Sequence, residues 1–96
     1  MSGRLAYHVY VLVSESTGRR YVGQTDEVER RVREHNRPEH NVRKFTSRHA
    51  GPWKLIHREA FDTRSEAMRR ERWLKSGQGR EWLDATYGRA SPPQAD

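Results

Sequence analysis

The chain has 96 residues, 32% of them hydrophobic and 33% charged, a balance that allows one small domain and excludes both a second lobe and a disordered chain. It has no cysteine and no apolar segment of membrane-spanning length, which excludes disulfides, thiolate zinc sites and a cysteine nucleophile, and we expect a cytoplasmic protein. The net charge is +6 and 16 of the 19 cations are arginines, which points to a polyanionic partner such as nucleic acid, with a merely solvated basic surface as the alternative that charge alone leaves open.

Two short segments near the N-terminus predict a β-hairpin. Residues 7–14, "YHVYVLVS", are rich in β-branched and aromatic side chains and too short for a typical helix, so they predict a buried strand. Residues 15–18, "ESTG", have turn chemistry, and residues 19–24 predict a returning strand. The two strands should pair in an antiparallel hairpin.

A first helix should follow this hairpin. Thr25-Asp26 offers an N-cap, and Glu29 stands three residues after Asp26, which is the spacing of a capping box. The helix should run to about Asn36. Its inward stripe is predicted to contain Val28, Arg31, Val32 and His35.

A basic loop and a third strand should come next. Residues 37–52 mix Pro, Asn, His, Arg and Lys, which favours a loop that holds at most a short helical turn. Residues 53–61, "WKLIHREAF", alternate well enough in polarity for a strand. Trp53, Leu55 and His57 are expected to share one face of it.

Two helices should close the domain. Thr63 and Glu66 form a second capping box, and a helix should run from it until Gly77 or Gly79 stops it. Residues 80–87 predict a short last helix. The inward stripe of the longer helix is predicted to contain Ala67, Met68, Glu71, Leu74 and Lys75.

The predicted architecture is a single α+β domain over residues 7–87, between a tail at residues 1–6 and a flexible tail at residues 88–96. A three-stranded antiparallel sheet is flanked by helices, in the order strand, strand, helix, strand, helix, helix. The arrangement should bring four polar side chains together. The hairpin places Tyr10 beside Tyr21, and Arg31 and His35 share the inward face of the first helix.

The motifs around these side chains resemble those of a known family. They are "HVY" at residues 8–10 and "YVG" at residues 21–23, followed by "GQTDEVERRVREHN" and later by "TRSEAMRRERWLKSGQGREW". Over about residues 7–83 the sequence resembles the GIY-YIG endonuclease domain. It looks most similar to small stand-alone members related to the catalytic domain of the excinuclease subunit UvrC.

The resemblance implies a metal-dependent endonuclease that hydrolyses phosphodiester bonds in DNA with one Mg²⁺ or Mn²⁺ ion. Without an attached targeting domain, weak sequence preference is expected, or recognition of branched, flapped or single-stranded DNA, in repair or processing. The protein should act as a monomer or a weak homodimer. The alternatives are a catalytically weak or inactive nucleic-acid-binding module of the same fold, and an RNA-directed or protein-binding role.

Four residues are expected to carry the proton and charge chemistry. Tyr10 is the predicted general base, provided that nearby cations or a metal-bound water favour its phenolate. Tyr21 and His35 should assist proton transfer or position the phosphate. Arg31 should stabilise the charge that develops on the phosphoryl group. The structural alternatives are cross-strand packing for the two tyrosines and an ion pair between Arg31 and Glu71.

Glu71 is the predicted metal ligand, because a hard cation prefers carboxylate oxygen and an acid on an inward face is costly unless paired or metal-bound. Glu66 is the competing choice, but it fits the capping box better. A zinc site at His35, His40, His49 and His57 is disfavoured by their irregular spacing and the lack of cysteine.

The substrate is expected to contact a further set of residues. Gly23 should let the backbone turn out of its strand and approach a phosphate closely. The other predicted substrate contacts are Gln24, Thr25, Arg30, Lys44, Arg48 and Lys75. Two departures from the family pattern, His8 for glycine and Gln24 for lysine, leave open whether activity is retained, whereas Val9 for isoleucine is a mild change.

Overall fold

The computed structural model describes residues 6–37 and 52–88, which form an α+β domain. Its elements are β1 (Tyr7–Ser14), β2 (Arg20–Thr25), α1 (Val28–His35), β3 (Trp53–Phe61), α3 (Arg64–Lys75) and α4 (Gly77–Tyr87). The predicted fold class is confirmed. The predicted loop falls almost wholly on residues 38–51, which lie outside the described residues together with residues 1–5 and 89–96. In the two described stretches, no helix has both the length and the apolar character that crossing a membrane requires.

The three strands form one antiparallel sheet in the order β2-β1-β3, so β1 is central. A tight turn joins β1 to β2, and Gly18 adopts a φ of 79° there, which a residue with a side chain rarely does. The predicted hairpin is therefore confirmed. Its register places Tyr10 opposite Gly23 on one side and Arg58 on the other.

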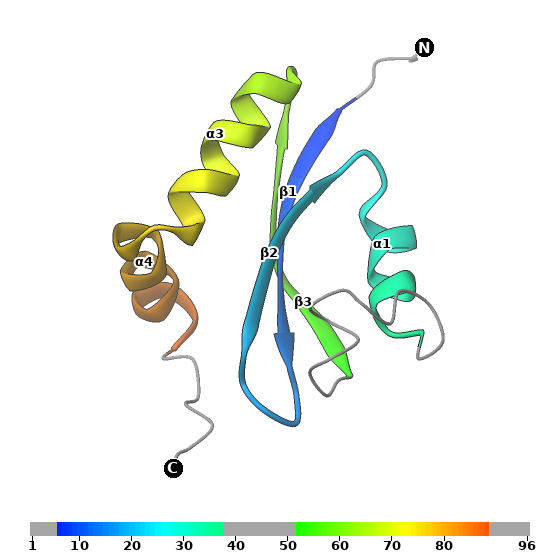
Figure 1. Cartoon of the computed structure of the whole chain (residues 1–96), viewed down its shortest axis with the longest axis vertical. Coiled ribbons are helices and arrows are strands. Elements are labelled where there is room, and N and C mark those ends of the chain that lie inside the picture. Colours follow the sequence, from blue (N-terminus) through cyan, green and yellow to red (C-terminus); the bar gives the residue numbers. More distant parts are fainter. Residues whose placement is uncertain (1–5, 38–51, 89–96) are drawn as a thin grey trace.

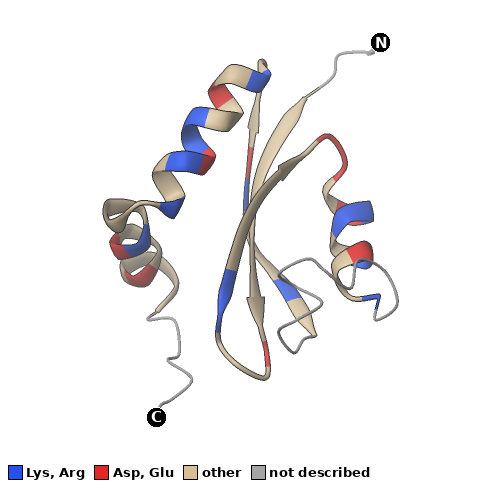
Figure 2. Ribbon diagram, viewed as in Figure 1, with Lys and Arg blue, Asp and Glu red and all other residues tan. Residues whose placement is uncertain are grey.

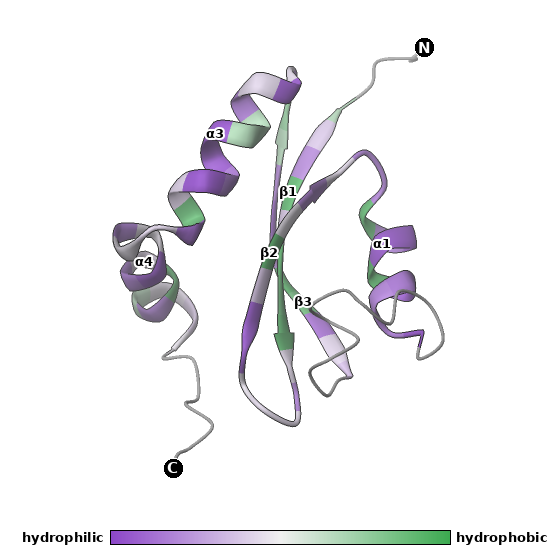
Figure 3. Cartoon of the chain, in the orientation of Figure 1, coloured by the Kyte–Doolittle hydropathy of each residue, from purple (hydrophilic) through white to green (hydrophobic). Residues whose placement is uncertain are grey.

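Helices cover both faces of the sheet: α3 and α4 pack on one face and α1 on the other (Figure 1). Side chains of β1 point alternately to the two faces of the sheet, so this strand contributes apolar residues to both interfaces with the helices. The most apolar bands of the ribbon lie along the strands (Figure 3). Toward α3 and α4 the buried residues are Val9, Val11, Val22, Ala67, Leu74 and Leu83. Toward α1 they are Tyr10, Leu12, Val28 and Trp53. Two thin apolar layers therefore hold the domain together.

A β-bulge on β3 changes which side chains face α4. The pairing of β3 with β1 shifts by one residue, which leaves Ile56 as the extra residue. Because of this shift, His57 does not share a face with Leu55. Its ring instead lies 5.3 Å from that of Trp82 on α4, between ring centroids. The predicted placement of His57 on the same face as Leu55 is wrong. The prediction assumed that side chains alternate strictly between the two faces of β3, and the bulged residue interrupts that alternation.

Helix α1 begins without the predicted capping box. Glu27 is the N-cap residue, and no side chain caps the helix. The Asp26 carboxylate instead accepts a hydrogen bond from Arg30 at 3.2 Å, four residues along the chain. By contrast, Thr63 caps α3 as predicted, since its hydroxyl accepts a hydrogen bond from the Glu66 backbone N–H at 3.1 Å.

The junction between α3 and α4 differs from the prediction. Helix α3 ends at Lys75, before either glycine, and Ser76 serves as the N-cap of α4 by accepting a hydrogen bond from the Gly79 N–H. The two glycines are therefore the beginning of α4 rather than the end of α3. A β-carbon on Gly79 would lie 2.1 Å from the Trp73 carbonyl oxygen, so only glycine lets the two helices meet this closely.

A polar network ties both of these helices to β3. Glu59 accepts two hydrogen bonds from Arg70 of α3, at 2.9 and 3.1 Å, and lies 2.7 Å from His57 Nε2. The Nδ1 atom of His57 lies 2.6 Å from the Tyr87 hydroxyl at the end of α4. Burial would raise the pKa of Glu59, but the hydrogen bonds from Arg70 and His57 outweigh burial and hold that pKa below its usual range.

Removal of the Glu59 charge should therefore destabilise the fold in a pH-dependent way. A carboxyl group with a depressed pKa adds stability that is present above its unfolded-state pKa and lost as the pH falls through the folded-state value. Glu59→Gln should lower the free energy of unfolding by about 1–3 kcal/mol at neutral pH. The difference from the wild type should shrink as the pH falls below the ordinary glutamate value of about 4.3.

Urea unfolding followed by circular dichroism over this pH range measures the effect. Glu81→Gln is the matched control, because Glu81 lies exposed on α4 and forms no ion pair among the described residues. It should change stability little at any pH. A loss in Glu59→Gln that is equally large in acid would contradict the role given to the Glu59 charge.

Candidate active site

Three rings from three elements meet on the α1 face of the sheet. Tyr10 of β1 lies with its hydroxyl 2.9 Å from His35 Nε2 at the end of α1. Tyr21 of β2 lies beside both, with ring centroids 6.1 Å from Tyr10 and 4.7 Å from His35. The hairpin register and the inward stripe of α1 produce this cluster, because they place residues 25 positions apart in hydrogen-bond contact.

Arg31 joins the cluster from one turn earlier in α1. Its guanidinium donates a hydrogen bond to Glu34 at 2.6 Å, and its positive charge interacts with the Tyr10 hydroxyl. Burial would lower the pKa of Arg31, but the contacts with Glu34 and Tyr10 outweigh burial and raise it, so the guanidinium is a fixed positive charge. Sequence reasoning missed Glu34, although a carboxylate three residues after an arginine on a helix is a detectable signal.

The environment of Tyr10 does not favour its phenolate. Its exposed fraction is 0%, and burial raises the pKa of Tyr10 far above the ordinary tyrosine value. The nearby Tyr21 raises that pKa further, and the opposing effect of Arg31 is too small to compensate. Arg31 does lower the pKa of Tyr10, but burial outweighs that effect, so the described residues by themselves favour the protonated phenol. Tyr10 is a buried hydroxyl that is hydrogen-bonded to His35.

Gly23 leaves the space that the two phenol rings occupy. A β-carbon at this position would lie 2.8 Å from the Tyr10 hydroxyl oxygen and 2.9 Å from Tyr21 Cε2, closer than real β-carbons approach other atoms. The backbone continues in β2 to Thr25, so Gly23 does not turn the chain out of its strand as predicted. The absence of a side chain is needed for packing at the site.

Glu71 lies on the other face of the sheet, on α3. Its carboxylate accepts a hydrogen bond from the Gln24 side chain at 2.8 Å and one from Lys75 Nζ at 2.7 Å. A hollow of about 210 Å³ adjoins it, lined by Gln24, Met68, Glu71, Arg72 and Lys75. Since Arg31 pairs with Glu34 and Glu71 with Lys75, the structural alternative in which Arg31 pairs with Glu71 is wrong.

The β2 strand separates the two groups. Gly23 faces Tyr10 and Tyr21, and the next residue, Gln24, faces Glu71. Strand β2 is an edge of the described sheet and runs between α3 and α1 in the view of Figure 1. One end of this strand therefore has the tyrosine cluster on one side and Glu71 on the other. The structure thus gathers four of the five predicted catalytic residues in one cluster and places the fifth across the edge strand.

Most of the other predicted substrate contacts that the structure describes already have partners within the protein. Arg30 is held by Asp26 and Glu34, at 3.2 and 3.4 Å. The Thr25 hydroxyl accepts a hydrogen bond from the Glu27 N–H at 3.1 Å. Of the remaining predicted cations, Lys75 lies at Glu71, and Lys44 and Arg48 lie outside the described residues.

Comparison with known proteins identifies the class to which this fold and site belong. The family model described as the GIY-YIG catalytic domain matches residues 6–82. The chain therefore belongs to the GIY-YIG family, a family of nucleases that act on DNA, and the resemblance seen in the sequence is confirmed.

Its relatives include small stand-alone proteins called UPF0213. One from Haloquadratum walsbyi is 49% identical over 70 residues, which cover 73% of this chain and 75% of that protein. One from Halobacterium salinarum is 48% identical over 69 residues, which cover 72% and 84%. The solution NMR structure of a UPF0213 protein from Bacillus halodurans matches with a TM-score of 0.50 and 32% identity, over 88% of this chain and 87% of that one.

A methyl group at position 23 should disrupt the tyrosine cluster. Gly23→Ala forces at least one phenol ring out of place, and since Tyr10 is fully buried the movement should cost about 1–3 kcal/mol of stability. The side-chain NMR signals of Tyr10, Tyr21 and His35 should shift together. Gly77→Ala is the control, because a β-carbon there meets nothing within 4 Å. A Gly23→Ala protein as stable as the wild type, with unshifted ring signals, would contradict this explanation of Gly23.

Proposed function

We propose that the protein is a metal-dependent endonuclease that hydrolyses phosphodiester bonds in DNA. The observation that carries the proposal is the position of the Tyr10, Tyr21, Arg31 and His35 cluster beside an edge strand whose opposite face presents Glu71. Hydrolysis of a phosphodiester needs a path for the proton of the attacking water, a fixed positive charge and a stabilised leaving oxygen. The residues around the end of β2 can supply the proton path and the fixed positive charge.

Tyr21 is the residue that we propose faces the attacking water. Its side chain is half-buried, whereas Tyr10 is fully buried and His35 is only 7% exposed. The ring of Tyr21 lies 4.7 Å from that of His35, between centroids, and the Tyr10 hydroxyl lies 2.9 Å from His35 Nε2. Tyr21 can therefore accept a proton from the water as its own hydroxyl proton passes toward the imidazole behind it. Tyr10 then orients His35 and Tyr21 rather than acting as the base itself.

Arg31 is proposed to hold the scissile phosphate. Its charge is permanent, and a hydrogen bond from a guanidinium to a phosphoryl oxygen strengthens as negative charge accumulates there. The ion pair with Glu34 fixes the guanidinium near the tyrosines before any substrate binds. The chemistry is therefore preorganised on the α1 side of β2.

Glu71 is proposed to hold one divalent ion, Mg²⁺ or Mn²⁺, in keeping with the general use of divalent metals in the family. A small hard cation keeps several waters and needs only one or two carboxylates besides phosphate oxygens, so a single glutamate fits this role. The Lys75 side chain is 54% exposed, so water can replace the carboxylate as its partner when a cation arrives. When bound, such an ion polarises phosphoryl oxygens and lowers the pKa of a coordinated water.

The proposed substrate choice rests on DNA shape rather than sequence. The polar groups gathered at β2 are hydroxyls, a guanidinium and a carboxylate, which suit phosphate and metal more than the edges of bases. We therefore propose weak sequence preference, action on branched, flapped or single-stranded regions in repair or processing, and a monomer or weak homodimer as the active form.

A catalytically weak DNA-binding module is the second candidate. One observation favours it: the Glu71 carboxylate already accepts hydrogen bonds from Gln24 and Lys75. A metal must compete with both donors, and Gln24 stands where the UvrC-like proteins that the sequence resembles have lysine. On this second account the fold and the basic surface are kept and cutting is slow or absent.

Cleavage assays separate the two candidates. Purified protein is incubated with supercoiled plasmid and with flapped and branched oligonucleotides, with Mg²⁺ or Mn²⁺ or with EDTA. The wild type should cut at least one of these DNA forms only when the metal is present. Glu71→Gln should lower the rate by about 100-fold or more, and Tyr21→Phe by about 100-fold.

Glu66→Gln is the matched control for Glu71→Gln, because it removes the same charge from an exposed position on the same helix. It should stay within about twofold of the wild type, as expected of an exposed substitution that leaves the site intact. Metal-dependent cutting that survives Glu71→Gln would exclude Glu71 as the ligand. Failure of the wild type to cut any DNA form with either metal would establish the second candidate.

A further inference from the structure

Among the described residues, five arginines are paired with carboxylates at 2.6–3.4 Å, and the remaining arginines form no ion pair. The pairs are Arg20 with Asp84, Arg30 with Asp26 and Glu34, Arg31 with Glu34, Arg58 with Glu29 and Arg70 with Glu59. A carboxylate partner offsets part of the attraction of these guanidiniums for phosphate, so they are less suited than unpaired arginines to a first encounter with DNA.

The outer side of α3 carries the contrasting group. Arg64, Arg69 and Arg72 are exposed, and among the residues that the structure describes none of them forms an ion pair. Figure 2 shows basic positions recurring along this helix. At a rise of about 1.5 Å per residue, the three arginines extend over about 12 Å of the helix axis.

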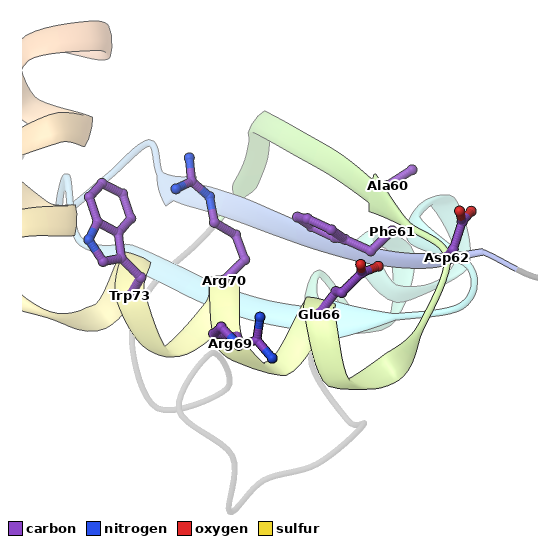
Figure 4. A pocket seen from close by; sticks show the side chains of 7 residues that line it. All are labelled: Ala60, Phe61, Asp62, Glu66, Arg69, Arg70 and Trp73. Carbon is purple, nitrogen blue, oxygen red and sulfur yellow. The ribbon is translucent and has the colours of Figure 1, made fainter.

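The neighbours Arg69 and Arg70 show the difference directly. Arg70 lies 4.5 Å over the centre of the Trp73 ring and is tied to Glu59. Figure 4 shows the two guanidiniums leaving α3 in different directions, with Arg69 on the opposite side of the helix ribbon from Arg70. Both border a hollow of about 520 Å³ that also includes Phe61 and Trp73. One arginine therefore serves the fold, and the other is available to a ligand.

Two adjoining hollows lie along the outer side of α3, one of them at Glu71. The other, of about 360 Å³, is lined by Arg64, Ser65, Met68, Arg69 and Arg72. Met68 and Arg72 line both hollows, so the two are neighbours along the helix. Met68 is 41% exposed between these cations and offers an apolar contact for a sugar or an unstacked base. We call the surface formed by these two hollows the α3 groove.

We propose that the α3 groove binds the phosphate backbone of a DNA strand, and that Arg69 and Arg72 are its main phosphate contacts. The groove has guanidiniums that form no ion pair among the described residues, and their planar forks can bind phosphate oxygens in pairs. One of its two hollows contains Glu71. The choice of DNA as the polyanion rests on the proposed function. On this account the strand runs along α3 and reaches the end of β2 from that side, while Arg30 and Arg58 on the α1 side keep their carboxylate partners.

Binding measured without metal tests the groove separately from cutting. Fluorescence anisotropy with a labelled short duplex that carries a single-stranded tail, in EDTA over a range of salt concentrations, gives the slope of log Kd against log salt. The double variant Arg69→Gln, Arg72→Gln should bind more weakly, and its slope should be smaller by about 1.8, the value for two lost phosphate contacts.

Arg19→Gln, Lys54→Gln is the matched control, because it removes the same charge from two exposed positions that form no ion pair among the described residues. These positions lie at the β1–β2 turn and the start of β3, at the end of the sheet away from the start of α3 (Figure 1). The control should keep the wild-type slope. If both double variants lost the same DNA affinity and slope, net charge alone would explain the effect, and the proposal would be overturned.

Two other results would also overturn it. One is a wild-type slope in Arg69→Gln, Arg72→Gln, and the other is binding of polyglutamate as tight as binding of DNA at the same salt concentration. Either result leaves metal-dependent cutting by the wild type as a separate question. Conversely, the wild type could cut no DNA and still bind it through Arg69 and Arg72. That result would disprove the proposed nuclease function and support DNA binding by the α3 groove.

Discussion

The hydrogen bond between the Tyr10 hydroxyl and His35 is the constraint on which the site depends. Tyr10 lies on the central strand and is fully buried, so its hydroxyl needs a partner inside the protein. His35, at the last turn of α1, supplies that partner at 2.9 Å and thereby fixes the helix against the sheet. The same contact brings Arg31 and Tyr21 into one cluster, which has room for both phenol rings because position 23 is glycine. The packing of the core and the geometry of the site are thus a single arrangement.

The sheet divides the chemistry between its two faces. On the α1 face, hydroxyls, an imidazole and a fixed positive charge suit proton transfer and phosphate binding. On the α3 face, a carboxylate suits a metal, and unpaired arginines line the α3 groove, which includes it. The edge strand β2 is the only described element that presents consecutive residues, Gly23 and Gln24, to both groups. A phosphodiester lying across this edge would contact both, which is why the edge is central to the proposed function.

The sequence predicted much of this arrangement, and the failures have identifiable causes. Strand alternation and motif spacing predicted the α+β fold, the hairpin, the Thr63 cap and the cluster around Tyr10. They failed where a local choice depends on tertiary neighbours. Asp26 pairs with Arg30 instead of capping α1, and one bulged residue moves His57 to the other face. The burial that raises the pKa of Tyr10, and the position of Glu71 across the sheet, follow from packing that no spacing along the chain reveals.

The most direct measurement is a crystal structure of the protein with Mn²⁺ and a DNA strand that carries a phosphorothioate at the position of the scissile bond. The account predicts the phosphorothioate at the end of β2, in contact with the Arg31 guanidinium and near the Tyr21 hydroxyl, with manganese density at the Glu71 carboxylate. Manganese bound elsewhere, or a phosphorothioate that contacts only one of the two faces, would contradict the claim that both act on the same bond.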